Sequence, residues 1–267
     1  MRVSFSQIGM FQRCPEQWRR RYIEKVVIPP AVAMVKGTSV HKTAETNFTQ
    51  KLLTGTDVSK ADMVDVAVDT LRTTVKNEGV LLSPDEQARG KSAVMDDAEK
   101  SVVVMSSLFA DDVAPKYQPA AVEVEQTIDV GDGDELTGRV DMITDTKHVV
   151  ELKTASKRMS DGEIDNMFQL TFYAGLYRVQ TGEYPAGLNV ERIVDKAKPE
   201  TQSLTTTRGD DDVAAMLHVV GAAIKNINVA KKAGAFMYAY GQTGAWWCSN
   251  RFCGYWSTCQ AVPKNKR

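Results

Sequence analysis

Asp141, Glu151 and Lys153 lie within two short apolar runs of "GRVDMITDTKHVVELK", residues 138–153. The polar stretch "TDTK" separates two apolar runs, which predicts an antiparallel hairpin centred near Thr146. In that register Asp141 faces Glu151 across the strands, with their Cβ atoms roughly 4.5–5.5 Å apart, and Lys153 shares their face. The other face of the hairpin is expected to point into the core with Val140, Met142, Val150 and Leu152.

Two carboxylates that face each other repel, and a cation between them removes this cost. Oxygen ligands suit Mg²⁺ or Mn²⁺, which lower the pKa of water and polarise a phosphoryl oxygen. The Lys153 ammonium could orient that water or neutralise charge that develops on phosphorus. These residue types therefore indicate hydrolysis of a phosphodiester, and the alternative is an acidic hairpin that serves only solubility.

The composition is that of a globular protein with a substantial core, because 43% of the 267 residues are hydrophobic. We expect a cytoplasmic protein without a membrane partner, since the N-terminus has no apolar signal segment. The formal net charge of -1 gives no general basic character, so any contact with DNA must come from local patches. The basic residues expected to contact DNA are Arg19, Arg20, Lys157 and Arg158.

Residues 1–115 are predicted to be mainly helical. Ser4 and Gln7 have the spacing of a helix start, and Pro15 suits the first turn of a second helix. A third helix is expected over 34–53, with His41 beside its apolar stripe, and further helices over 58–78 and 83–110. The predicted buried stripe of the third helix consists of Val40, Ala44, Phe48 and Leu52.

Residues 118–235 change to an alternation of strands and helices. Strands are predicted near 122–130, in the hairpin, and near 187–194 and 201–206, with helices over 162–180 and 210–232. The sum is a small sheet that carries helices, with the helical N-terminal part packed against it. We therefore expect one domain over residues 1–267.

The order "GRVD", "ELK" and "QLTFY" resembles the PD-(D/E)XK nuclease superfamily, in particular the RecB-like and AddB-like nucleases and the related CRISPR-associated nucleases. The resemblance implies an α/β restriction-endonuclease-like core with a small central mixed sheet flanked by helices. It also implies that Asp141, Glu151 and the backbone carbonyl of Leu152 bind the metal, and that Lys153 assists the attacking water.

Two further motifs extend the resemblance. Gln169 and Tyr173 match a Gln-x-x-x-Tyr element on a helix, which implies a role in positioning the substrate strand. "GTSVH", which ends at His41, is similar to an upstream Gly-x-x-x-His element whose histidine is a further metal ligand. Glu123 or Glu125 could add another acid near the metal, or both could face solvent.

The cysteines lie at the two ends of the chain, at Cys14, Cys248, Cys253 and Cys259. Disulfides are not expected in a reducing compartment, and a shared site would join the two ends of the chain. One N-terminal and three C-terminal cysteines resemble the iron-sulfur nucleases of the same family, which implies a [4Fe-4S] cluster in residues 245–260 joined by Cys14. Zinc is the main alternative. The aromatic residues expected to wall the cluster, or to form plain core, are Trp246, Trp247, Phe252, Tyr255 and Trp256.

Together these features predict a metal-dependent DNA nuclease, and an exonuclease in particular, that acts in recombination, repair or end processing. The resemblance implies a phage or mobile-element setting and a helicase or recombination protein as partner. A non-catalytic DNA-binding or assembly subunit and a four-cysteine zinc protein remain as alternatives. The first would bind DNA without Asp141 or Glu151, and the second would contain zinc.

Overall fold

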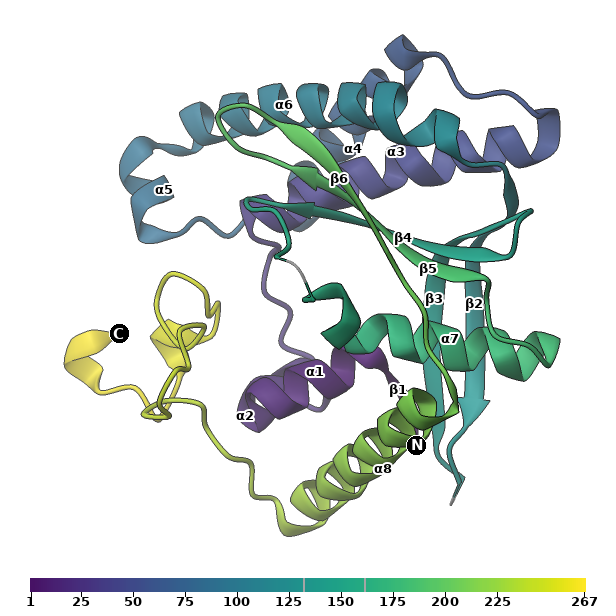
Figure 1. Ribbon diagram of the computed structural model, residues 1–267. Helices are drawn as coiled ribbons and strands as arrows, with labels where there is room; N and C mark the ends of the chain where they lie inside the picture. The colour runs from purple at the N-terminus through teal and green to yellow at the C-terminus, as the bar shows by residue number, and fades with distance from the viewer. Residues whose placement is uncertain (132, 161) are drawn as a thin grey trace.

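A six-stranded mixed sheet lies between two layers of helices in the computed structural model, which describes residues 1–131, 133–160 and 162–267 (Figure 1). The α/β architecture predicted from the sequence is confirmed. The strand order is β1-β3-β4-β5-β6, with β2 paired to β3. The strands are β1 (Arg2–Ser4), β2 (Pro119–Asp129), β3 (Glu135–Thr144), β4 (His148–Ala155), β5 (Gly187–Val194) and β6 (Glu200–Thr206).

One face of the sheet is covered by three long helices, α3 (Val32–Thr54), α4 (Lys60–Glu78) and α6 (Lys91–Leu108) (Figure 1). Their apolar side chains form a buried cluster with Met142, Val150 and Leu152 of the sheet. The short helix α5 (Pro84–Arg89) precedes α6. Most helices of the predicted N-terminal region are therefore one layer of the core.

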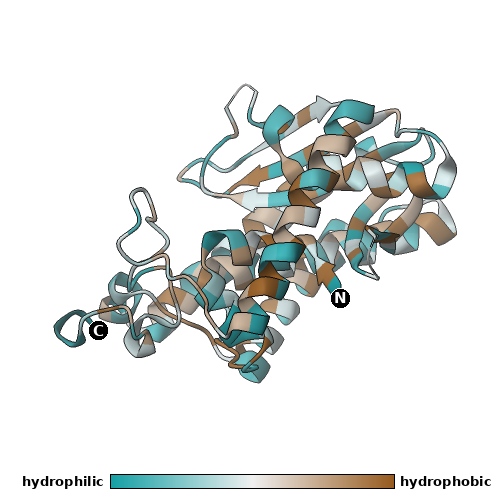
Figure 2. Ribbon diagram, turned by 90° about the horizontal axis from the view of Figure 1, so that it is seen from below, coloured by the Kyte–Doolittle hydropathy of each residue, from teal (hydrophilic) through white to brown (hydrophobic). Residues whose placement is uncertain are grey.

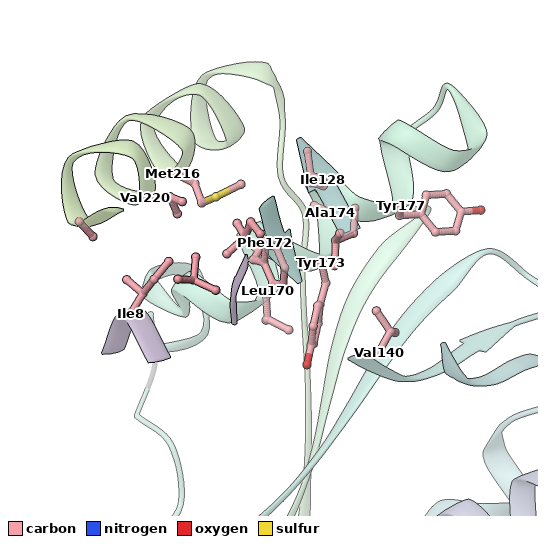
Figure 3. Packing of buried hydrophobic residues seen from close by; sticks show 14 of the residues in the cluster. Ile8, Ile128, Val140, Leu170, Phe172, Tyr173, Ala174, Tyr177, Met216 and Val220 are labelled. Atoms are coloured by element: carbon pink, nitrogen blue, oxygen red, sulfur yellow. The ribbon is translucent and has the colours of Figure 1, made fainter. Parts of the chain in front are cut away.

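The opposite face is covered by α1 (Phe5–Arg13), α7 (Phe168–Thr181) and α8 (Asp210–Ala233), and α2 (Pro15–Tyr22) follows α1. Phe172 packs between α7 and α8 near Met216, whereas the Tyr173 hydroxyl points away from this group (Figure 3). Hydrophilic and hydrophobic residues both occur along the helices, as expected for amphipathic helices that each bury one side (Figure 2).

Two details of the helical prediction are wrong. The helix expected over 83–110 is broken at Gly90, whose φ of 84° lies in the left-handed region, so that α5 ends and α6 begins there. Leu52 was expected in the buried stripe of α3 but is exposed, whereas Lys51 is buried, because a step of four residues exceeds the 3.6-residue turn and the stripe drifts around the helix. The other three residues of that stripe are buried.

Helix α8 is long and apolar enough to cross a membrane by length and composition. One such helix is weak evidence, because core helices of soluble proteins meet the same criterion. Met216, Val220 and Ile224 of α8 are buried in the cluster that α8 forms with α1 and α7. The helix thus has a structural role in this fold, although only 28% of its apolar window is buried.

Strand β3 changes face at Asp141. Val140 belongs to the buried cluster on the α7 side, whereas Met142 belongs to the cluster on the α3 side. The prediction that both point to one side is therefore wrong. Glu123, which lies opposite on β2, has a φ of 52°, and this irregular backbone accompanies the break in alternation. The kink places Asp141 between the two layers.

One edge of β3 is shared by two strands. β1 pairs in parallel with the residues up to Thr137, and β4 pairs antiparallel from Met142 onward, while β2 occupies the other edge. Among the described residues, 138–141 therefore have no strand partner on this edge. The three-residue strand β1 was not predicted, because so short a segment has no readable alternation. The unpaired stretch leaves an opening in the sheet at the predicted active-site aspartate.

Gly138 lies in this opening, against the core helix α7. A Cβ atom at this position would lie 2.1 Å from Cε1 of the fully buried Phe172. We expect Gly138→Ala to destabilise the protein by about 1–3 kcal/mol, because the ring must shift within a packed core. Thermal unfolding would measure this as a melting temperature several degrees lower.

Gly221→Ala is the matched control for this substitution. A Cβ atom at Gly221 of α8 meets nothing within 4 Å. Alanine is favoured over glycine within a helix by about 1 kcal/mol, so this variant should melt at or above the wild-type temperature. Equal melting temperatures for the two variants would contradict the close approach at Gly138.

Candidate active site

The hairpin of β3 and β4 positions the two predicted carboxylates. Met142 pairs with Val150 and Ile143 with Val149, which confirms the predicted register. The paired residues of the two strands end there. Asp141 and Glu151 were expected to be a cross-strand pair, but the backbone does not pair them. Instead the Asp141 carboxylate accepts a hydrogen bond of 2.9 Å from the backbone N–H of Leu152. The strands therefore separate at the carboxylates and leave room between them.

Glu151, Lys153, Gln169 and Tyr173 form one hydrogen-bonded network. The Lys153 ammonium is ion-paired with Glu151 and donates to Oε1 of Gln169 at 2.9 Å. The Gln169 amide donates to Oε1 of Glu151 at 3.0 Å and to the Tyr173 hydroxyl at 2.6 Å. Tyr173 in turn donates to the backbone carbonyl of Arg139 at 2.8 Å, in the unpaired stretch of β3. The four residues, taken from two elements, thus hold one another in place.

His41 reaches the site from the opposite layer. Its Nδ1 lies 3.5 Å from Oδ2 of Asp141. One turn earlier on α3, Gly37 has its missing Cβ position only 3.1 Å from Oγ1 of Thr154, so glycine lets the helix approach β4. The spacing of four residues places both on one face of α3. Burial lowers the pKa of His41, which favours the neutral imidazole that can bind a metal.

Burial shapes the electrostatics of the carboxylates. It raises the pKa of Asp141 to about 6 and, together with the nearby Asp141, the pKa of Glu151 to about 7. Oε2 of Glu151 is buried and has no hydrogen-bond partner among the residues that the structure describes. A buried carboxylate oxygen without a partner is costly, and a cation would remove this cost. The donor set thus fits a divalent metal ion with oxygen ligands.

Among the residues that the structure describes, no group of three or more His, Cys, Asp and Glu side chains is arranged to hold a metal ion. Mg²⁺ does not require three such side chains, because it is commonly held by one or two carboxylates together with water and substrate phosphate. Asp141, Glu151 and the Leu152 carbonyl correspond to this kind of site.

These pKa values have a consequence for stability. The folded protein binds more protons at Asp141 and Glu151 than the unfolded chain, whose values are 3.8 and 4.5. The free energy of unfolding in EDTA should therefore fall as the pH rises from about 4 through about 7. Over this range the two carboxyl groups lose their protons, and the folded protein must then bury negatively charged carboxylates. Melting temperatures at about pH 5 and about pH 7.5, compared with Asp141→Asn/Glu151→Gln, measure this contribution. An unchanged pH slope in the double variant would contradict it.

Other acidic residues surround the site. A small cavity of about 20 Å³ lies between the α3 layer and the sheet, and its lining includes His41, Glu45, Glu123, Asp141 and Glu191. Glu123 is ion-paired with Arg139, and its pKa is raised by burial. Glu125 is exposed and pairs with Arg2 at 2.9 Å. Of the two predicted alternatives, Glu123 is therefore the one near the carboxylates.

Glu45 and Glu191 also lie near the site and were not predicted from the sequence. Glu45 follows His41 by one helical turn, and that spacing could have indicated it. Glu191 pairs with Leu152 across the parallel strands β4 and β5, a contact without a sequence signal. Its buried carboxylate accepts hydrogen bonds from the Tyr117 hydroxyl at 2.6 Å and from Ser203 at 2.8 Å. Both carboxylate oxygens of Glu191 thus accept hydrogen bonds from the protein, and the residue lines the small cavity at the site.

All four cysteines line one pocket at the junction of the chain ends, and all are free thiols. Cys14 lies between α1 and α2, and Pro15 begins α2 as predicted. Burial and the other three cysteines raise the pKa of Cys248 to about 11. A bound cation would favour the thiolates that burial disfavours. The chemistry of the donor set therefore fits a thiolate-bound metal or cluster, although, among the described residues, these side chains also do not form a closed metal site.

Arg19 and Arg20 contribute to this junction. Arg19 makes two hydrogen bonds, of 2.7 and 2.8 Å, to the buried Glu16. Arg20 donates to Glu16 and to the side chain and backbone carbonyl of Thr258, at 2.8 and 2.9 Å. Both guanidinium groups therefore donate hydrogen bonds to other parts of the protein. They were expected to contact DNA instead. Lys157 and Arg158 follow β4 and are exposed.

The aromatic residues of the C-terminal segment divide into two groups. Tyr255 and Trp256 line the cysteine pocket. Trp246 and Phe252 are 68% and 53% exposed and contact each other, with ring centroids 5.0 Å apart. For Trp246 and Phe252 both predicted alternatives, a wall around the cluster and plain core, are therefore wrong, because the loop turns these two rings toward solvent.

The fold and the site together define a nuclease of the restriction-endonuclease-like α/β class. A family model described as the PD-(D/E)XK nuclease superfamily matches residues 2–260, and the chain belongs to this superfamily. Its nucleases usually use Mg²⁺ or Mn²⁺.

A solved structure shows the same fold. The crystal structure of a "Putative exonuclease" from Eubacterium rectale is 15% identical, with a TM-score of 0.59, and the match covers 91% of this chain and 86% of that chain. The crystal structure of SSO0001 is 14% identical over 97% of this chain and 86% of that chain, with a TM-score of 0.44. A comparison with curated proteins finds no match.

Proposed function

We propose that the protein is a metal-dependent deoxyribonuclease that degrades DNA from its ends. The observation that carries this proposal is the buried Glu151, which contacts Lys153 and Gln169 but leaves Oε2 without a partner at the opening in the sheet. Family membership supports phosphodiester hydrolysis, and the description of the Eubacterium rectale protein supports an exonuclease.

Each residue of the site has a chemical role in this proposal. Asp141, Glu151, the Leu152 carbonyl and His41 would hold Mg²⁺ or Mn²⁺, which supplies Lewis acidity to water and to a phosphoryl oxygen. The Lys153 ammonium orients the attacking water and neutralises charge that develops on phosphorus. The roles in substrate positioning belong to Gln169 and Tyr173, with Lys157 and Arg158 as exposed cations near the end of β4.

We further propose that the four cysteines hold a [4Fe-4S] cluster, with Zn²⁺ as the alternative. The convergence of all four thiols on one pocket supports a shared site. The cluster would have a structural role, because it joins the start of α2 to the C-terminal segment. Among the described residues no nucleotide-driven motor motif accompanies the site, so a helicase or recombination protein is the kind of partner that would supply free ends.

Degradation of end-labelled DNA tests the proposed function. Single- and double-stranded substrates are incubated with Mg²⁺, Mn²⁺ or EDTA. We expect mononucleotides or short products with either metal and none with EDTA. Labels at the 5′ and 3′ ends then report the polarity. Binding of DNA without cleavage under every condition would instead favour the non-catalytic subunit.

A further inference from the structure

A second cavity, of about 330 Å³, opens beside Gln169 and Tyr173. It lies among the start of α1, the unpaired stretch of β3 and α7, and is much larger than the cavity of about 20 Å³ at His41. Its volume is at the lower end of the range typical of small-molecule sites. Two residues that line this groove, Gln169 and Tyr173, therefore belong to the network that holds Glu151.

The walls of the groove combine an aromatic ring with polar groups. Phe5 is partly buried and packs on Phe172 with ring centroids 6.2 Å apart, which holds its ring in place. Ser4 and Ser6 supply hydroxyl groups at the first turn of α1, and they contact each other at 2.9 Å. Such a wall suits a base, which stacks on an aromatic face, joined to a phosphate, which accepts hydrogen bonds.

The charges at the rim are balanced. Arg139 pairs with Glu123, and Glu125 pairs with Arg2 at 2.9 Å. The Arg139 side chain is 59% exposed, so its guanidinium stays accessible while it pairs with Glu123, whose side chain is 19% exposed. The pair of Arg2 and Glu125 is exposed on both sides, at 57% and 68%, and such pairs are weak. A phosphate can therefore compete for Arg139, and binding should weaken as the salt concentration rises.

We propose that this groove binds the nucleotide next to the cleaved phosphodiester, with its base against Phe5 and its phosphate at Ser6 and Arg139. The proposal rests on the DNA nuclease activity proposed above and adds the substrate contact of that site. Gln169 and Tyr173 connect the groove to Glu151, so that a nucleotide held there lies beside the reacting carboxylates.

Ser6→Glu tests the phosphate contact, because it adds negative charge at the groove. Ser92→Glu is the matched control, since Ser92 is also the second residue of a helix, in α6, and is exposed. A glutamate in the first turn favours either helix, so both variants should fold. We expect Ser6→Glu to raise the Kd of a fluorescent single-stranded oligonucleotide in EDTA about tenfold, and Ser92→Glu to change it less than about twofold.

Phe5→Leu tests the base contact and keeps an apolar side chain in the core. We expect the Kd to rise about fivefold for a normal oligonucleotide but not for one that lacks bases, because only the former can stack. Equal binding by wild type, Ser6→Glu and Phe5→Leu would overturn the groove proposal while the nuclease stands. A wild-type protein that neither binds nor cleaves DNA would overturn both.

Discussion

Replacement of Glu151 by glutamine is expected to lower the rate of DNA cleavage at least about 10³-fold, equivalent to about 4 kcal/mol in the transition state. The amide cannot supply the negative charge that holds a divalent cation. The folded protein should not lose stability in EDTA, because the variant removes a buried carboxylate whose pKa is raised to about 7. Single-turnover cleavage and thermal unfolding measure the two effects.

Lys153→Ala separates metal binding from chemistry at the same site. Its cleavage rate should fall at least about 10²-fold, because the ammonium no longer stabilises charge on phosphorus. Calorimetric titration with Mn²⁺ should show that Glu151→Gln loses metal affinity and that Lys153→Ala keeps most of it.

Lys147→Ala is the control for the lysine, since Lys147 lies in the turn of the same hairpin and its side chain is 63% exposed. Its cleavage rate should match that of wild type. Full activity in both Glu151→Gln and Lys153→Ala would show that this network is not the active site.

Cys253→Ala is expected to lower the melting temperature of the anaerobically purified protein by about 10 °C or more. The physical reason is that binding of a metal or cluster by four thiolates contributes directly to the free energy of folding. Cys253 lines the pocket together with Cys14, which is far away in the sequence, so the loss would release the C-terminal segment from α2. Differential scanning calorimetry and iron and zinc analysis measure the outcome.

Ser257→Ala is the control for this change, because Ser257 is exposed in the same segment. It should melt at the wild-type temperature and keep the wild-type metal content. Iron with a visible absorption band would identify the cluster, and zinc in a colourless protein would identify the alternative. A Cys253→Ala protein with wild-type stability would contradict a metal-dependent junction.

The junction of the chain ends also has interactions between protein groups. Glu16 binds both Arg19 and Arg20, and Arg20 binds the Thr258 carbonyl. The pairs with Glu16 have the i,i+3 and i,i+4 spacing of one helix, whereas the contact with Thr258 could not be read from "RRR", because a charge run in a sequence is equally compatible with a solvated surface. Only the return of the C-terminal segment to α2 provides Arg20 with its acceptors at Thr258.

Much of the fold was accessible from local pattern. The alternation of residues in the strands, the caps at Ser4 and Ser83 and the turn before His148 depend on neighbours in the chain, and the structure agrees with them. The long helix expected over 83–110 failed at Gly90, where a positive φ outweighed continuous helix propensity. The prediction that Val140 and Met142 share one face failed for a different reason. The switch of face at Asp141 depends on how β2 meets β3.

The sequence by itself determined the family and the residue types of the site, since Asp141, Glu151, Lys153, Gln169 and Tyr173 stand at spacings that one hairpin and one helix impose. The tertiary structure alone decided how they meet. β1 and β4 divide one edge of β3 between them, and the resulting opening admits His41 from one layer and Tyr173 from the other. Burial of the carboxylates, and hence their raised pKa values, follows from this packing of distant segments, which no local pattern encodes.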